Sequence, residues 1–410
     1  MNLDSISFFY FFLFLIFFEV LIQIFVNSVK KEFPWLITID DELPYFDKKK
    51  FNKFLNNSFD ENLGWVRKPN EKGIEKARSN NVSFSIDKYG SRENIYNTGK
   101  AKIAAFGDSY TFCRQVSNEH TWESILAKET KLNVLNYGVG NYGIDQAFMR
   151  YESLTLPKEV DIVTLGFVPE TIARVHSYWK HYLEFGNIFA FKPRYKLDKG
   201  NKIQLIKSPI KSIKDIDNLS SNLGSIQKYD FFYKRKFKKL QFSFPYLFTF
   251  LRTPYRNIRL FSGIAIKILF NLFKLRSDVV DNYPFSVIMK DNIKLSHLMY
   301  KNSENILLLK KIIEKFVKTA KMKGHIPVIL VMPQLYDLKL AKIKKTPYQS
   351  FYEELPQSYN VLDLTTTFLK EFSSDLYIED SYGGHLSKKG NNLVAKTLQE
   401  FIKEKKIKIN

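Results

Sequence analysis

The longest apolar segment of the chain covers residues 6–26, where nearly every position is apolar and one carboxylate, Glu19, interrupts the run. About twenty such residues are enough to cross the hydrocarbon core of a membrane as a helix. A carboxylate in mid-helix costs about 3 kcal/mol, whereas each Phe, Leu, Ile or Val returns roughly 0.3 to 0.6 kcal/mol, so the segment still favours insertion. The start carries Asp4 in place of Lys or Arg, and no small-x-small cleavage site precedes Lys30. Both features favour an uncleaved anchor over a signal peptide.

The side of the membrane is harder to predict. Lys30 and Lys31 follow the apolar segment, and the positive-inside rule would keep them cytoplasmic, but that rule weakens for large translocated domains. We expect a single-pass anchor with an extracytoplasmic main domain, with the sidedness left open. Glu19 has two interpretations: a carboxyl that protonates or snorkels, or one that meets a helix partner in the membrane.

From Lys102 onward, apolar segments of strand length alternate with amphipathic segments of helix length. This alternation is typical of a parallel sheet covered by helices. We therefore predict the α/β class, with a flavodoxin-like, doubly wound, five-stranded parallel sheet whose site lies at the carboxyl ends of the strands. The five strands are centred, in chain order, on Ile103, Val134, Ile162, Val328 and Val361.

The alternation divides the chain into five segments. Residues 1–29 form the anchor, 30–99 a stem with strands that lead into the core, 100–175 the first part of the core, 176–304 an insertion, and 305–410 the second part of the core. The insertion is basic and aromatic, and its segment GIAIKILFNLF is too short, and too interrupted by Lys267, to span a bilayer. It is either an interfacial helix or a helical lid that packs on the sheet.

Composition and charge limit the classes of partner and cofactor that we expect for this chain. Lys and Arg number 63 against 42 Asp and Glu, and the net charge of +21 favours anionic surfaces. No nucleic-acid-binding motif accompanies the basic residues, so we expect no nucleic-acid partner. Cys113 is the only cysteine, which excludes an intrachain disulfide or a cysteine-built metal site. GVGNYG lacks the spacing of a dinucleotide fingerprint, and we expect neither a cofactor nor a metal.

Candidate chemistry lies at two points, in AAFGDSYTFC and in DSYGGHLSKKGN. Ser109 follows the first predicted strand, at the expected start of a helix whose positive end would favour an oxyanion. A serine hydroxyl needs a base to take its proton, and His385 stands in a glycine-rich loop before the last helix. Asp380 could hold the neutral imidazole tautomer. The simpler interpretations are a helix cap for Ser109 or His385 and a solvated loop carboxylate for Asp380.

These residues resemble the SGNH/GDSL hydrolase family in three blocks, FGDSYTF, NYGVGNYGIDQ and GGHLSKKGNNLVA. The resemblance implies that Ser109 is the nucleophile, that His385 is the base, and that the glycine loop lends an N–H group to the oxyanion hole. Asp108 is expected to brace its loop as a hydrogen-bond acceptor. The oxyanion and substrate candidates are Gly138, Gly140, Asn141, Gly143, Glu170 and Thr171.

The chain departs from the family pattern in three places. Asn141 stands where many relatives have glycine, so the donor N–H could come from Asn141, Gly140 or Gly143. LGFVPETI offers Glu170 and Thr171 where the family has an asparagine donor. Glu170 would have to be protonated, or else Thr171 or a backbone amide takes over, or activity is reduced. The spacing of Asp380 to the histidine is also irregular, and Asp375 is the reserve candidate.

We therefore expect a membrane-anchored serine ester hydrolase or O-acyltransferase, with an acylated envelope glycan or lipid-linked sugar as the substrate that the resemblance implies. The first rival is a catalytically impaired SGNH-like scaffold that binds glycan or partner proteins, and the second is a peripheral lipid-binding protein. If His385 is the base, the rate should fall as the pH drops through the imidazole pKa, between about pH 8 and 5.

Overall fold

The computed structural model describes residues 3–76, 81–96, 99–378 and 384–409. The chain forms two compact units, which we describe separately. The anchor unit comprises Met1–Phe51, Ser177–Phe191 and Ile213–Ile288, and the sheet unit comprises Asn52–His176, Lys192–Ser212 and Met289–Asn410. The segments expected as stem (30–99) and insertion (176–304) therefore each contribute residues to both units.

The centre of the sheet unit is one sheet of five parallel strands. The strand order is β11-β10-β7-β5-β6, which in sequence order of these five strands is the flavodoxin-like order 2-1-3-4-5 read from the other edge. The predicted class, strand number and strand positions are confirmed. The strands are β5 (Ala101–Gly107), β6 (Asn133–Gly138), β7 (Ile162–Phe167), β10 (Ile326–Val331) and β11 (Asn360–Asp363).

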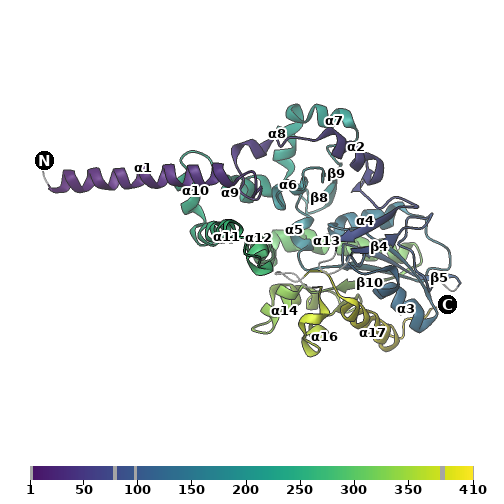
Figure 1. Ribbon diagram of the computed structural model, residues 1–410. Helices are drawn as coiled ribbons and strands as arrows, with labels where there is room; N and C mark the ends of the chain where they lie inside the picture. The colour runs from purple at the N-terminus through teal and green to yellow at the C-terminus, as the bar shows by residue number, and fades with distance from the viewer. Residues whose placement is uncertain (1–2, 77–80, 97–98, 379–383, 410) are drawn as a thin grey trace. The chain divides into compact units, whose positions relative to one another are not determined.

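Helices cover both faces of this sheet (Figure 1). On one face, the Phe106 ring contacts Tyr151 of α4 (Ile144–Ser153), and Tyr151 in turn contacts Phe316 of α13 (Ser303–Met322). The other face is packed by apolar side chains of α3 (Trp122–Thr130), α16 (Thr365–Lys370) and α17 (Lys388–Glu404). All six residues of β7 are buried, as expected for a central strand covered on both faces.

Short elements complete the sheet unit. Three two-stranded antiparallel pairs lie outside the main sheet: β1 (Phe59–Asp60) with β2 (Gly64–Trp65), β3 (Lys72–Lys76) with β4 (Asn81–Ser85), and β8 (Arg194–Leu197) with β9 (Ile203–Ile206). β4 lies within the segment 30–99, where strands leading into the core were expected, but it pairs with β3 outside the main sheet. The remaining helices are η2 (Asn118–His120), α5 (Thr171–Arg174), α14 (Leu335–Ala341), α15 (Pro347–Glu353) and η4 (Ser374–Leu376).

The anchor unit is helical apart from its connecting segments. Its longest helix, α1 (Leu3–Val29), contains the candidate membrane span Ile6–Val29, which length and composition allow either as a signal anchor or as a signal peptide. α2 (Lys48–Asn57) begins in this unit, and the last part of α12 (Asp278–Met299) belongs to the sheet unit. The others are η1 (Ile39–Glu42), α6 (Lys180–Leu183), α7 (Ile213–Asp217), α8 (Leu219–Tyr229), η3 (Tyr233–Phe237), α9 (Lys238–Leu240), α10 (Tyr246–Arg252) and α11 (Pro254–Leu272).

Within the anchor unit, α10 and α11 pack on the second half of α1. The buried residues of this contact form the anchor cluster: Ile22, Val26, Val29, Phe33, Leu36, Phe242, Leu260 and Ile264. The stem is held here as well, since the Lys30 ammonium lies 2.7 Å from the Asp41 carboxylate. The first half of α1 is exposed.

Candidate active site

Ser109 stands in a loop that follows the carboxyl end of β5, which we call the Ser109 loop (residues 108–118). Gly107, the last residue of β5, lies so close to β7 that a Cβ atom there would lie 2.0 Å from the carbonyl oxygen of Gly166, so a side chain has no room. The α-helix expected to start at Ser109 does not form. Cys113 and Gln115 adopt positive φ angles of 54° and 67°, which an α-helix does not tolerate, and consecutive turns replace it. The expected contribution of a helix dipole at Ser109 is therefore absent.

His385 reaches this loop from the segment before α17. Its Nε2 atom lies 2.8 Å from Ser109 Oγ, across 276 positions of sequence. The Tyr110 ring lies 5.3 Å from the imidazole, between ring centroids, and its hydroxyl donates to the carbonyl of Gly384 at 3.2 Å. The sheet unit thus brings together the hydroxyl and the imidazole that the sequence places in separate blocks.

The second ring nitrogen of His385 faces an amide. Nδ1 lies 3.1 Å from Gln115 Oε1, and the His385 backbone N–H points to the same oxygen at 3.4 Å. Because an amide oxygen only accepts, Nδ1 carries the proton and Nε2 is free to accept from the serine hydroxyl. Gln115 therefore selects the tautomer that a general base needs. It lacks the negative charge that would stabilise an imidazolium.

The structure describes one of the two candidate aspartates. Asp380 lies outside the described residues. Asp375 is exposed, and its carboxylate pairs with the Lys389 ammonium at 3.0 Å. Gln115 is the group that sequence reasoning missed. It belongs to no block of the family resemblance, and nothing in the local pattern marks it.

The electrostatic environment keeps His385 neutral. Burial, followed by the positive charges of Arg114 and Arg174, lowers the pKa of His385 from its ordinary value to about 3. If His385 is the base, the fall in rate expected between pH 8 and 5 would therefore lie at much lower pH. At neutral pH the ring is in the form that accepts a proton.

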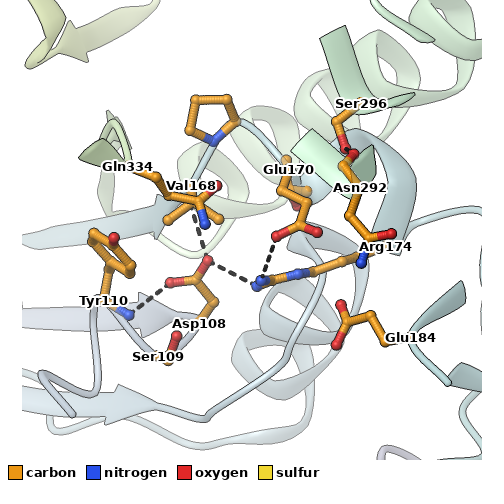
Figure 2. A network of polar contacts seen from close by, with 12 residues as sticks. Asp108, Ser109, Tyr110, Val168, Glu170, Arg174, Glu184, Asn292, Ser296 and Gln334 are labelled. Carbon is orange, nitrogen blue, oxygen red and sulfur yellow. Dashed lines mark hydrogen bonds and ion pairs between the residues drawn. The ribbon is translucent and has the colours of Figure 1, made fainter. Parts of the chain in front are cut away.

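Asp108 braces the start of the Ser109 loop (Figure 2). Its Oδ1 accepts the N–H of Tyr110 at 2.8 Å, and its Oδ2 accepts the N–H of Val168 at 3.0 Å and an N–H of the Arg174 guanidinium at 3.2 Å. Burial raises the pKa of Asp108, and the neighbouring charge of Arg174 opposes that rise. The contacts match the bracing role expected of this residue.

A buried arginine supports the far side of the same loop. Arg92 is 2% exposed, and its guanidinium donates to the carbonyls of Phe112, Cys113 and Val116 and to the side chain of Asn118. Backbone carbonyls in consecutive turns lack the hydrogen-bond donors that a helix would give them. The Arg92 side chain supplies donors to three of these carbonyls. Sequence reasoning did not identify Arg92.

The glycine loop lies beside the Ser109 loop. At Gly138 a Cβ atom would lie 2.2 Å from the backbone nitrogen of Phe112, so the two loops approach too closely for a side chain. The Gly138 N–H donates to Asn136 Oδ1 at 2.9 Å, and the Gly143 N–H points to Gln146 Oε1 at 3.5 Å. Asn141 adopts the left-handed φ of 69° that its side chain was expected to tolerate. Of the loop amides, that of Gly140 is our candidate oxyanion donor.

The two residues that replace the family asparagine have other partners. Thr171 Oγ1 accepts the N–H of Ile144, 2.8 Å away, at the start of α4. The Glu170 carboxylate pairs with the Arg174 guanidinium at 3.1 Å, as Figure 2 shows. Arg174 also donates to the carbonyl of Tyr142 at 3.2 Å. The Arg174 guanidinium therefore lies between Asp108, Glu170 and the glycine loop. The sequence had indicated only Glu170 and Thr171 as oxyanion candidates for this part of the site.

Among the described residues, no group of three or more His, Cys, Asp or Glu side chains is placed to hold a metal ion. Cys113 is buried, and burial raises the pKa of its thiol well above the ordinary value. The His176 carbonyl accepts from Arg194 at 2.6 Å, and His181 Nε2 lies 2.7 Å from the Asp41 carbonyl oxygen, so both have structural contacts.

Comparison with known proteins gives distant matches. No protein-family model and no curated protein matches the chain. Among solved structures, the fold matches a candidate lipolytic protein of the G-D-S-L family from Desulfitobacterium hafniense DCB-2, with a TM-score of 0.33 and 12% identity, over 74% of this chain and 99% of that one. A second crystal structure matches with the same TM-score and identity, over 75% of this chain and 98% of its own.

Proposed function

We propose that the protein cleaves acyl esters through a covalent intermediate on Ser109. The observation that carries this proposal is the 2.8 Å contact between Ser109 Oγ and Nε2 of a neutral His385. Nε2 accepts the hydroxyl proton while Oγ attacks the acyl carbonyl, and the ester C–O bond breaks as the same proton passes to the leaving alcohol. A second acceptor then releases the acyl group and restores the hydroxyl.

The oxyanion formed on attack needs donors. We propose the backbone amides of Ser109 and Gly140, with the Arg174 guanidinium close by as a fixed positive charge. Asp108 and Glu170 hold this guanidinium in place through ion pairs at 3.2 and 3.1 Å, so little reorganisation would accompany the reaction. In this proposal, a guanidinium that stays protonated and positively charged takes the role that the family resemblance gives to a neutral asparagine.

The decisive experiment is labelling with a fluorophosphonate probe, which reacts with activated serines. The full chain should be labelled, and Ser109→Ala and His385→Ala should both lose the label while remaining folded. Ser153→Ala is the matched control, because Ser153 Oγ donates to the Arg150 carbonyl at the end of α4. Equal labelling of the Ser109→Ala variant would remove Ser109 from the mechanism.

A second candidate function is a binding scaffold with an impaired site. Gln115 supports it, because the amide that meets Nδ1 carries no negative charge to stabilise the imidazolium, and the positive charges of Arg114 and Arg174 oppose its formation. If the folded parent protein resists the probe, the scaffold is the better interpretation. Measured binding to an acylated glycan, without turnover, would then identify its role.

The fate of the acyl group is a separate part of the proposal. Water as acceptor gives an esterase, and a sugar hydroxyl gives an O-acyltransferase, with the same residues in both. The envelope glycan implied by the family resemblance is the first substrate to test. Incubation of the purified full chain with a short-chain aryl ester, with and without a sugar acceptor, separates the two by the products formed.

We further propose that α1 is retained as an anchor. Ile22, Val26 and Val29 are buried in the anchor cluster, so cleavage before Lys30 would remove part of that unit's apolar core. The mass of the mature protein in the membrane fraction tests this, since a chain beginning near Lys30 would contradict it. Probe labelling of intact and permeabilised cells then reports the side of the membrane.

A further inference from the structure

Two helices of the anchor unit, α10 and α11, carry many large apolar side chains that are exposed. On α10 and α11, Phe248, Ile258 and Leu272 are 58%, 56% and 72% exposed. Contiguous apolar surface of this kind is rare on soluble monomers and marks a surface that is covered by something else. The further exposed apolar residues of these helices and of the segment after α11 are Leu251, Tyr255, Ile266, Leu269, Phe273 and Leu275.

The opposite faces of the same helices are packed on α1. Leu260 and Ile264 of α11 are fully buried with Ile22 and Val26, and the Phe25 and Phe261 rings stack at 4.6 Å between centroids. α10 and α11 thus lie against the second half of a helix whose first half is exposed and apolar. The apolar surface of α1 continues onto these two helices.

The hydrogen bonds of Glu19 show at which position along α1 the helix α10 begins. Its Oε1 accepts the N–H of Tyr246 and its Oε2 accepts the N–H of Leu247, both at 2.7 Å. The carboxylate therefore caps the first turn of α10, where backbone N–H groups have no partner within the helix. This is the helix partner that one interpretation of the sequence required, and it comes from the same chain.

The depth of the contact follows from helix geometry. The candidate span of 24 residues is about 36 Å long at 1.5 Å per residue, against about 30 Å of hydrocarbon. Glu19 precedes Val29 by about 15 Å, so even if all the excess length lay on that side, Glu19 would still lie about 9 Å inside the hydrocarbon. The N-terminus of α10 lies at the same depth. Seven residues of α10 span about 10 Å, enough to bring Arg252 back to the headgroups.

The pairing satisfies both partners. Inside hydrocarbon, a backbone N–H without a partner costs several kcal/mol, and an isolated carboxylate costs about 3 kcal/mol. Here the two N–H groups and the positive end of α10 meet the carboxylate, so each offsets the other's cost. Cations follow at the exposed positions Arg252, Lys274 and Arg276, where lipid phosphates would pair with them. Within α11, the Lys267 ammonium has a protein partner, since it pairs with the Asp281 carboxylate at 3.4 Å.

We propose that α10 and α11 form a membrane-inserted hairpin, docked on α1 through Glu19, whose exposed apolar face is covered by the acyl chains of the bilayer. This goes beyond the ester chemistry proposed above and does not depend on it. The protein would then be held in the membrane by a helical hairpin as well as by its single span.

Spin-label accessibility in the full chain tests the proposal. Labels are placed singly at Phe248→Cys and Leu272→Cys, with Ile343→Cys as the matched control, because Ile343 is an apolar residue of the sheet unit with 80% exposure. The parent protein should take little label, since Cys113 is buried. The proteins are reconstituted in phosphatidylcholine–phosphatidylglycerol vesicles.

In these vesicles the labels at 248 and 272 should contact oxygen severalfold more than a water-soluble nickel reagent, and the label at 343 should show the reverse. Preference for nickel at both hairpin positions would overturn the proposal, because the hairpin would be in water. Protection from both reagents would also overturn it, because a second copy or another protein would then cover the face.

The role of Glu19 is tested in the Phe248→Cys background. Glu19→Leu removes the cap while making α1 more apolar, so α1 stays inserted and the label at 248 should become more mobile and change depth. Glu19→Gln keeps one accepting oxygen and should give a smaller change. If Glu19→Leu leaves the label unchanged in mobility and depth, Glu19 does not dock the hairpin.

Discussion

Asp108 of the sheet unit and Glu19 of the anchor unit are both carboxylates that accept two backbone N–H groups. Asp108 accepts those of Tyr110 and Val168, and Glu19 accepts those of Tyr246 and Leu247. Asp108 also pairs with the Arg174 guanidinium and is 1% exposed within packed protein. Glu19 lies on an apolar helix whose first half is exposed.

The difference shows how each unit satisfies its polar groups. In the sheet unit, protein supplies both the partners and the apolar surroundings, and exposed apolar residues such as Ile343 are scattered singly. In the anchor unit, protein supplies the partners, while the surroundings must come from outside the chain. The same local chemistry therefore braces the Ser109 loop in one unit and, in our proposal, docks a membrane-inserted hairpin in the other.

The largest expected effect comes from Asp108→Asn. An asparagine carries one accepting oxygen, so the N–H of Val168 or Tyr110 and the Arg174 guanidinium lose a buried partner. We expect the free energy of unfolding of the sheet unit to fall by about 3 kcal/mol. Denaturant unfolding followed by a sheet-unit probe measures it. Asp375→Asn, which removes only an exposed ion pair with Lys389, is the control and should leave the midpoint nearly unchanged. If Asp108→Asn lowers the free energy of unfolding no more than Asp375→Asn does, Asp108 does not brace the loop.

A smaller effect is expected at Glu19. Because the cap is one pair of hydrogen bonds to a charged acceptor, Glu19→Leu should destabilise the packing of α10 on α1 by about 2 kcal/mol. Proteolysis of the membrane-reconstituted protein within residues 243–276 should then proceed faster, while cleavage in the sheet unit should stay at the parent rate. Faster cleavage in both units would break the comparison, since Glu19 would then influence more than its own unit.

Gln115→Glu sharpens the comparison by giving His385 a carboxylate. A negative charge beside Nδ1 stabilises the imidazolium, so the pKa of His385 should rise and kcat/KM for a short-chain aryl ester should increase about tenfold near pH 7. Gln115→Ala is the matched control, in which the tautomer is no longer selected and the rate should fall. If Gln115→Glu changes neither the rate nor its pH dependence, Gln115 does not act on His385.

The smallest expected effect is the pH dependence of the parent protein. The imidazole acts as a base only when neutral, and its pKa is lowered to about 3, so kcat/KM should be nearly constant from about pH 5 to 8. The rate should fall only as the pH decreases through the pKa of the folded protein. A half-maximal rate near pH 6.5 would show that burial and the two arginines do not depress this pKa.

Much of the fold followed from local sequence patterns. Five apolar strands alternating with amphipathic helices predicted the sheet, because burial on both faces requires continuous apolar runs such as that of β7. Ser109 and His385 could be identified because each stands in a recognisable block after a predicted element. The prediction of a helix at Ser109 was wrong. Cys113 and Gln115 adopt positive φ angles, but because neither residue is a glycine, the sequence does not indicate that the chain leaves helical geometry there.

What the tertiary structure alone decided are contacts between distant positions. Gln115 meets His385 across 270 positions, Arg174 meets Asp108 across 66, and Tyr246 meets Glu19 across 227. The sequence by itself determined the apolar span, the α/β sheet and the reactive side chains, because those depend on residue type and spacing along one element. Which amide faces the imidazole, which cation pairs with Asp108 and which helix the Glu19 carboxylate caps depend on how elements pack, and no single segment carries that information.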